Sequence, residues 1–140
     1  MSQLATRWGA LAPYCLGLMR IIAAFMFIQA GTMKLFGWPA EMPGGGTVEI
    51  FTQIGIGAIL EFVGGLLMLI GLWVRPVAFV LSGEMAVAYW QFHAPGSFWT
   101  SVNGGVPAVL YCFLFLYYSM TGAGKLSIDE WWGKRKSVSA

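Results

Sequence analysis

The sequence predicts an all-α integral membrane protein, a four-helix bundle formed by a single domain of residues 1–140. Hydrophobic residues make up 58% of the chain and charged residues only 10%, whereas soluble domains contain about 25% charged residues. The apolar residues gather in four stretches that approach the length of about 20 residues needed to cross a bilayer, and Gly and Pro cluster between them. This composition is too poor in polar groups to cover a water-facing surface, which disfavours a soluble domain.

The connections between the apolar stretches set the expected helix boundaries. The segment "GWPAEMPGGGTVEI" separates the first two stretches, "VRP" makes a tight turn after the second, and "HAPGSFWTSVNGG" separates the last two. Pro76 suits the first turn of the third helix, where a missing N–H leaves no intrahelical bond unmade. The expected helices therefore cover residues 14–36, 53–73, 77–93 and 105–121.

The basic residues predict an orientation with both termini in the cytoplasm. Cytoplasmic loops carry an excess of Lys and Arg, and the loops at 37–52 and 94–104 contain neither residue. The pattern predicts a multi-pass protein of the bacterial cytoplasmic (inner) membrane. In a count of four helices, one side of the membrane receives Arg7, Arg75, Lys125, Lys134, Arg135 and Lys136.

The small net charge of +2 is not arranged as a nucleic-acid surface. A nucleic-acid reader requires a basic face, and the basic residues here lie mostly near the chain ends. The last basic run, "GKRK" at 133–136, follows Trp131 and Trp132. This pattern is typical of a cytoplasmic membrane anchor, so membrane lipid rather than nucleic acid is the expected partner.

Two carboxylates are expected near the middle of the membrane. At 1.5 Å per residue, Glu61 lies about 3 Å from its helix midpoint, and Glu84 lies at about the same depth. An acidic residue there costs about 2.5–3.5 kcal/mol and normally faces the protein interior. Glu61 belongs to a helix seam with small residues, which points it into the bundle; the seam consists of Gly57, Glu61, Gly64, Met68, Gly71 and Arg75.

Arg20 is the expected partner of these carboxylates. It lies about 7–8 Å to the cytoplasmic side of its helix midpoint, and its long side chain could pair with Glu84 or Glu61. Otherwise one carboxyl stays protonated and donates a hydrogen bond. Together with Tyr89, these residues form a predicted polar network, either an ion pair that fixes helix register or a site that carries protons or binds a polar headgroup.

A second cluster is predicted at the outer mouth, the end of the bundle expected to face the periplasm. Lys34 ends the first helix, His93 ends the third, and Asn103 precedes the fourth. The cluster could receive a quinone head, a small anion or a partner protein. The alternative is an interfacial aromatic belt with a snorkelling Lys34. A lone His with no second His or Cys nearby does not predict a metal site.

The two cysteines are not expected to form a disulfide. Cys15 should lie near the cytoplasmic surface and Cys112 near the middle of the fourth helix, a difference in depth of roughly 15 Å. Disulfides require Cα separations below about 7 Å.

A family resemblance rests on six segments, "RIIAAFMFIQAGTMKLFGW", "EFVGGLLMLIGLWVRP", "GEMAVAYWQFHAP", "NGG", "AVLYCFLF" and "GAGKLSID", which include Arg20, Lys34, Glu61, Glu84, His93 and Asn103. These segments resemble the DoxX family of small bacterial membrane proteins. The resemblance implies a four-helix membrane protein associated with redox systems, because related proteins occur as small subunits of a thiosulfate:quinone oxidoreductase and in thiol-stress complexes. Relatives often read "NGGE", whereas Val106 follows the two glycines here, so a carboxylate expected at the outer mouth is absent.

Three functions remain open from the sequence. The favoured one is a redox-associated subunit that binds a quinone or a similar lipid-soluble molecule, a partner oxidoreductase, or both. No haem-ligand pair, iron–sulfur cysteine set or dinucleotide fingerprint is present, so no intrinsic cofactor is predicted. The second function is a non-catalytic assembly protein with a partner protein or as a homo-oligomer. The third, a small-solute or proton transporter, is disfavoured because no inverted repeat is visible. The sequence assigns no catalytic residue.

Overall fold

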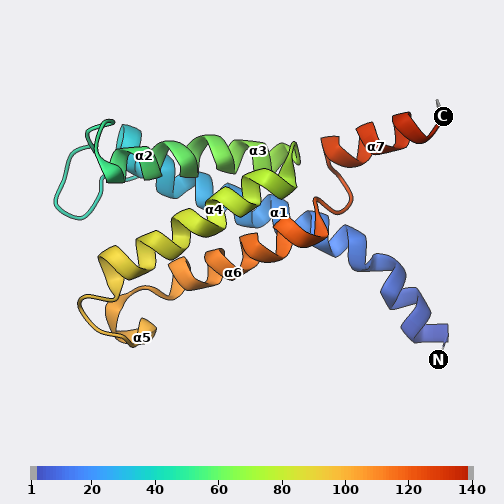
Figure 1. Ribbon diagram of the computed structural model, residues 1–140, viewed down its shortest axis with the longest axis horizontal. Coiled ribbons are helices and arrows are strands. Elements are labelled where there is room, and N and C mark those ends of the chain that lie inside the picture. Colours follow the sequence, from blue (N-terminus) through green and yellow to red (C-terminus); the bar gives the residue numbers. More distant parts are fainter. Residues whose placement is uncertain (1–2, 139–140) are drawn as a thin grey trace.

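The computed structural model describes residues 3–138, and every regular element in this range is a helix (Figure 1). Two of the long helices contain a π-helical turn, η1 and η2, that continues the preceding α-helix. In chain order the elements are α1 (Gln3–Phe36), α2 (Gln53–Ile59), η1 (Leu60–Gly64), α3 (Gly65–Ile70), α4 (Val74–Ala88), η2 (Tyr89–His93), α5 (Thr100–Asn103), α6 (Val106–Thr121) and α7 (Ile128–Val138).

The long helices pack in two layers that share one apolar core. α1 packs along α2, η1 and α3, while α4 packs along α6 and also contacts η1 and α3. Phe27 joins α1 to α6, because its ring centroid lies 4.9 Å from that of Phe115 and 5.1 Å from that of Tyr111. The core also contains Met68 and Leu81, both buried.

The approach of α1 to η1 depends on Gly31. A β-carbon at this position would lie 2.7 Å from the backbone nitrogen of Phe62. Such a contact is too short for any side chain, so glycine allows the two backbones to touch, as small residues do between membrane helices. This contact places the end of α1 directly beside the π-helical turn.

The two ends of the molecule differ in content. Figure 1 shows both chain ends and the α3–α4 turn at one end, and the loop after α1 together with α5 at the other. The first of these is called the terminal end here, and the second the loop end. The basic residues expected on one side of the membrane accordingly belong to segments of the terminal end. Which side of a membrane this end faces remains a prediction.

The helix boundaries differ from the expected ones mainly at the terminal end. The first helix begins at Gln3, eleven residues before the expected residue 14, and bends away from the bundle in its early part, which contains Pro13 (Figure 1). The second ends at Ile70, because Gly71 adopts a φ of 72° and stops the helix. Apolar length indicates where a chain can cross a membrane, but helices also continue through less apolar residues. For the same reason α5 and α7 were not predicted.

Two stretches of the described chain are long and apolar enough to cross a membrane, Arg7–Phe36 and Gln53–Ile70, and α6 is a shorter apolar helix. Large apolar side chains are also exposed on the outer faces of the helices. Phe79 is 67% exposed, and Leu110 and Phe113 are each 65% exposed. Such a surface in water is an aggregation hazard, whereas lipid covers it favourably. Cys15 and Cys112 are both free thiols, as expected.

Candidate ligand pocket and its charged residues

The first charged contact of the site joins α1 to η1. Lys34, in the last turn of α1, places its Nζ 2.5 Å from Oε1 of Glu61. Glu61 is only 2% exposed. Its second oxygen, Oε2, is buried and accepts no hydrogen bond from the described residues. Glu61 lies within η1, and π-helical turns of this kind occur frequently at functional sites.

Glu84 brings a second carboxylate to this region from α4. Its Oε1 lies 3.4 Å from the point that a β-carbon on Gly57 would occupy, so the absence of a side chain at Gly57 leaves room for the carboxylate. Its Oε2 is buried and also lacks a hydrogen-bond partner within the described chain. Glu84 interacts electrostatically with both Glu61 and Lys34. Lys34 therefore pairs with Glu61 and lines the same cavity as Glu84.

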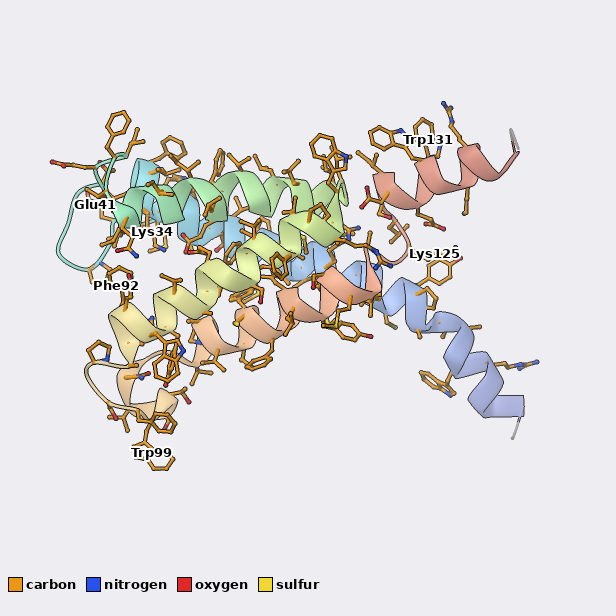
Figure 2. All side chains as sticks on the ribbon, in the orientation of Figure 1. Lys34, Glu41, Phe92, Trp99, Lys125 and Trp131 are labelled. Carbon is orange, nitrogen blue, oxygen red and sulfur yellow. The ribbon has the colours of Figure 1, made fainter. Side chains whose placement is uncertain are left out.

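A cavity of about 470 Å³ adjoins these groups between α2 and the α4–η2 helix. Known ligand sites are of this size and combine mainly apolar walls with a few polar groups. Figure 2 shows Lys34 and Phe92, two of the lining residues, at the loop end of the molecule. The polar lining residues are Lys34, Gln53, Glu84 and His93, and the apolar lining includes Met42, Ile54, Ile56, Leu60, Val80, Val87, Ala88 and Phe92.

A side-chain hydrogen bond links the two walls of this pocket. Gln53 Nε2, at the start of α2, donates to Gln91 Oε1 in η2. Neither residue was assigned a role from the sequence, because each is a single amide in a different segment. Only the packing of α2 beside η2 brings the two together.

The predicted pairing of Arg20 with Glu84 or Glu61 is wrong. Arg20 is fully buried and donates hydrogen bonds to four backbone carbonyls at the terminal end. Its Nε is 3.0 Å from the oxygen of Ala123, and other nitrogens lie 2.8 Å from that of Leu69 and 2.7 Å from that of Leu126; Met68 supplies the fourth acceptor. The last carbonyls of a helix lack intrahelical donors, and Arg20 donates to two of them in α3, those of Met68 and Leu69.

Asp129, the first acidic residue of α7, is a second structural charge that the sequence analysis did not identify. Its Oδ1 and Oδ2 accept hydrogen bonds from the backbone N–H groups of Trp73 and Val74, each at 2.8 Å. A carboxylate is favourable at a helix N-terminus because the helix dipole is positive there. Trp73 adopts a φ of 50°, which is uncommon for a bulky residue, and Asp129 holds it in place. The available signal was the "GAGKLSID" segment, which contains this residue.

Tyr89, predicted to join the carboxylate network, instead holds the loop between η2 and α6. Its hydroxyl donates to the carbonyl of Phe98 at 2.7 Å. His93 Nδ1 lies 3.0 Å from the carbonyl oxygen of Asn103. The Asn103 side chain donates to Ser97 O at 2.6 Å and accepts from the N–H of Gly105 at 2.7 Å.

The predicted outer-mouth cluster is therefore divided. His93 and Asn103 are in contact, as the predicted cluster requires. Lys34 shares the pocket lining with His93 but makes its ion pair with Glu61. Lys34 thus replaces Arg20 as the cation that pairs with Glu61.

Comparison with known proteins places the pocket helices within a recognised family. The sequence model of the DoxX family matches residues 15–94, more than half of the chain. The chain belongs to the DoxX family. The match contains all of α2, η1, α4 and η2, whereas α6 and α7 lie beyond it. DoxX proteins are membrane-associated.

This DoxX protein is also similar to an uncharacterized protein of Haemophilus influenzae. The two are 40% identical over 121 residues, which cover 84% of this chain and 90% of the relative. No solved structure matches the chain. The chemistry of the pocket is therefore argued from its own residues. Lys34 offers hydrogen-bond donors and Glu84 offers acceptors beside an apolar wall, an arrangement suited to an amphipathic molecule with a polar head.

Proposed function

We propose that this DoxX protein is a four-helix, multi-pass protein of the bacterial inner membrane whose pocket binds a quinone or a similar lipid-soluble molecule. In this proposal the protein works with a partner oxidoreductase, which carries out the electron transfer. The single observation that supports binding is the pocket between α2 and α4–η2, which joins an apolar lining to Lys34, Glu84 and His93.

The character of the lining supports a lipid-soluble ligand. Ile54, Val80 and Val87 line the pocket and are also exposed on the molecular surface. A ligand that arrives through the bilayer can pass along such apolar residues without losing favourable contacts. Its polar head can then reach the charged residues, whose hydrogen bonds are stronger away from water.

The topology within this proposal follows from the basic residues. Arg7, Arg75 and Lys125 belong to segments of the terminal end, which on the rule for Lys and Arg faces the cytoplasm. The pocket then opens toward the periplasmic half of the membrane. Single-cysteine labelling tests this orientation, because a probe that cannot cross the membrane should label position 46 in intact cells and position 138 only after permeabilisation. The reverse pattern contradicts it.

Ligand binding is tested by purifying the full chain from bacterial membranes in a mild detergent and measuring extracted quinones by mass spectrometry. Gly83 lines the pocket, and a β-carbon there meets no atom within 4 Å, so Gly83→Phe should fill the pocket without disturbing the fold. Gly9→Phe is the matched control, because a β-carbon at Gly9 also meets no atom within 4 Å and Gly9 is not a lining residue. Stoichiometric quinone in the wild type and control, and its loss in Gly83→Phe, supports the proposal. Equal amounts of quinone in Gly83→Phe and Gly9→Phe contradict the proposal.

A non-catalytic assembly role is the second candidate function. Its support is the terminal end, where Arg20 and Asp129 hold helix ends and connecting segments together. The same purification distinguishes the two functions. A stoichiometric enzyme subunit without any small molecule favours assembly, whereas a co-purified quinone favours the binding role.

A further inference from the structure

The pocket offers two polar groups of opposite hydrogen-bonding character. The Lys34 ammonium has three N–H donors, and Glu61 Oε1 accepts one of them. In its ionised form the carboxylate of Glu84 can only accept. Both Lys34 and Glu84 line the cavity, so a single head group can meet a donor and an acceptor together.

Glu84 is the carboxylate of the pocket lining with which Lys34 forms no ion pair in the described chain. Lys34 forms its ion pair with Glu61, at 2.5 Å. Glu84 Oε2 is buried without a hydrogen-bond partner in the described chain. An incompletely partnered carboxylate away from bulk water is unfavourable, and a hydrogen-bond donor on a ligand in the cavity that Glu84 lines offsets this. His93 is the other titratable group of the lining, and its Nδ1 is engaged with Asn103.

We propose, on the basis of the function proposed above, that the pocket prefers the reduced, hydroxyl-bearing form of a quinone-class ligand to the oxidised form. The hydroxyl group of a hydroquinone donates its hydrogen to Glu84, and the same oxygen accepts a hydrogen bond from Lys34. An oxidised quinone has carbonyl oxygens only. These suit Lys34 but place lone pairs against the carboxylate, so Glu84 stays without a partner.

The preference is measured with the full chain in detergent, using a short-chain benzoquinone and the corresponding hydroquinone kept reduced under anaerobic conditions. Hydrogen bonds to charged groups are among the stronger ones in proteins, so the hydroquinone should bind about ten- to a hundred-fold more tightly. Glu84→Gln should reduce this ratio to within about three-fold while both forms still bind, because an amide offers both a donor and an acceptor. Glu49→Gln, which changes a carboxylate outside the lining, should keep the full ratio.

A ligand series provides a second measurement that requires no variant. The dimethyl ether of the hydroquinone lacks the O–H donors and should bind as weakly as the oxidised quinone. Equal binding of the quinone and hydroquinone to the wild type, as expected of a protonated Glu84, overturns this inference and leaves the proposed function standing. An unchanged ratio of hydroquinone to quinone affinity in Glu84→Gln also overturns the inference. Binding of neither form overturns both proposals.

Discussion

The charged side chains at the two ends of the molecule differ in how completely they are hydrogen-bonded. At the terminal end, Arg20 donates to four carbonyls, and both oxygens of Asp129 accept backbone hydrogen bonds. At the loop end, Glu61 and Glu84 each keep one buried oxygen without a partner among the described residues, and Glu84 also lines a cavity. A buried charge whose hydrogen bonds are all made stabilises the architecture, whereas one with free capacity at a cavity is suited to a ligand.

The largest expected loss of stability follows from replacing Arg20. Arg20→Met should lower the free energy of unfolding by about 3 kcal/mol or more, because each buried acceptor left unsatisfied costs about 1–3 kcal/mol. Arg20→Lys should lower the free energy of unfolding by less, because lysine keeps the charge but presents fewer donors in a different geometry. Thermal unfolding in detergent measures both variants. A stability change below about 1 kcal/mol for Arg20→Met would contradict a structural role.

The comparison also predicts that the two ends are energetically independent. Arg20→Leu and Glu84→Leu should change stability additively, within about 0.5 kcal/mol, because their side chains share no partner. A double-mutant cycle from thermal unfolding gives the coupling energy. Recovery of stability in the double variant would show that the two charges form a pair after all.

A smaller loss is expected at Asp129. Asp129→Ala should cost about 1–2 kcal/mol, the usual range for a lost helix cap strengthened by the dipole. Glu130→Ala is the control, because Glu130 is the neighbouring residue on α7 but pairs with Lys125 and Lys134 rather than with backbone N–H groups. Equal losses in the two variants would show that the contact with α4 adds nothing specific.

Glu84 should behave differently from Arg20 in the same measurement. Glu84→Gln keeps the shape and removes an incompletely partnered carboxylate, so the free energy of unfolding should stay within about 0.5 kcal/mol of the wild type or rise. Ligand binding should nevertheless change in this variant. A loss as large as that of Arg20→Met would place Glu84 among the structural charges and remove the contrast between the two ends.

The smallest expected effect is the pH dependence of stability that comes from Glu130 on the surface of α7. Hydrogen bonds from Lys125 and Lys134 hold the pKa of Glu130 below its ordinary value of 4.5. The resulting stabilisation is present above pH 4.5 and disappears as the pH falls through the lowered pKa of the folded state. The stability difference between the wild type and Glu130→Gln should therefore be small at pH 7 and vanish in acid. A difference that grows as the pH falls would contradict this ion pair.

The sequence by itself determined the all-α class, the apolar helices, the DoxX family and the free cysteines. Apolar composition and the Gly and Pro residues carry the class and the helices locally, so no knowledge of the packing is required. The family follows instead from the resemblance of whole segments, and the separation of the cysteines from their depth along the helices. The inward direction of Glu61 also followed from a seam along a single helix, and the structure buries this residue.

The tertiary structure alone decided which charges meet. Residue depth, counted along one helix, gives the height of a side chain but neither its direction around the helix nor which neighbour lies there. Long Arg and Lys side chains can extend toward either end, which is why Arg20 binds the carbonyls at the end of α3 and Lys34 reaches Glu61. The cap formed by Asp129 and the pocket beside Glu84 likewise arise from segments far apart in the chain, because only packing brings their atoms into contact.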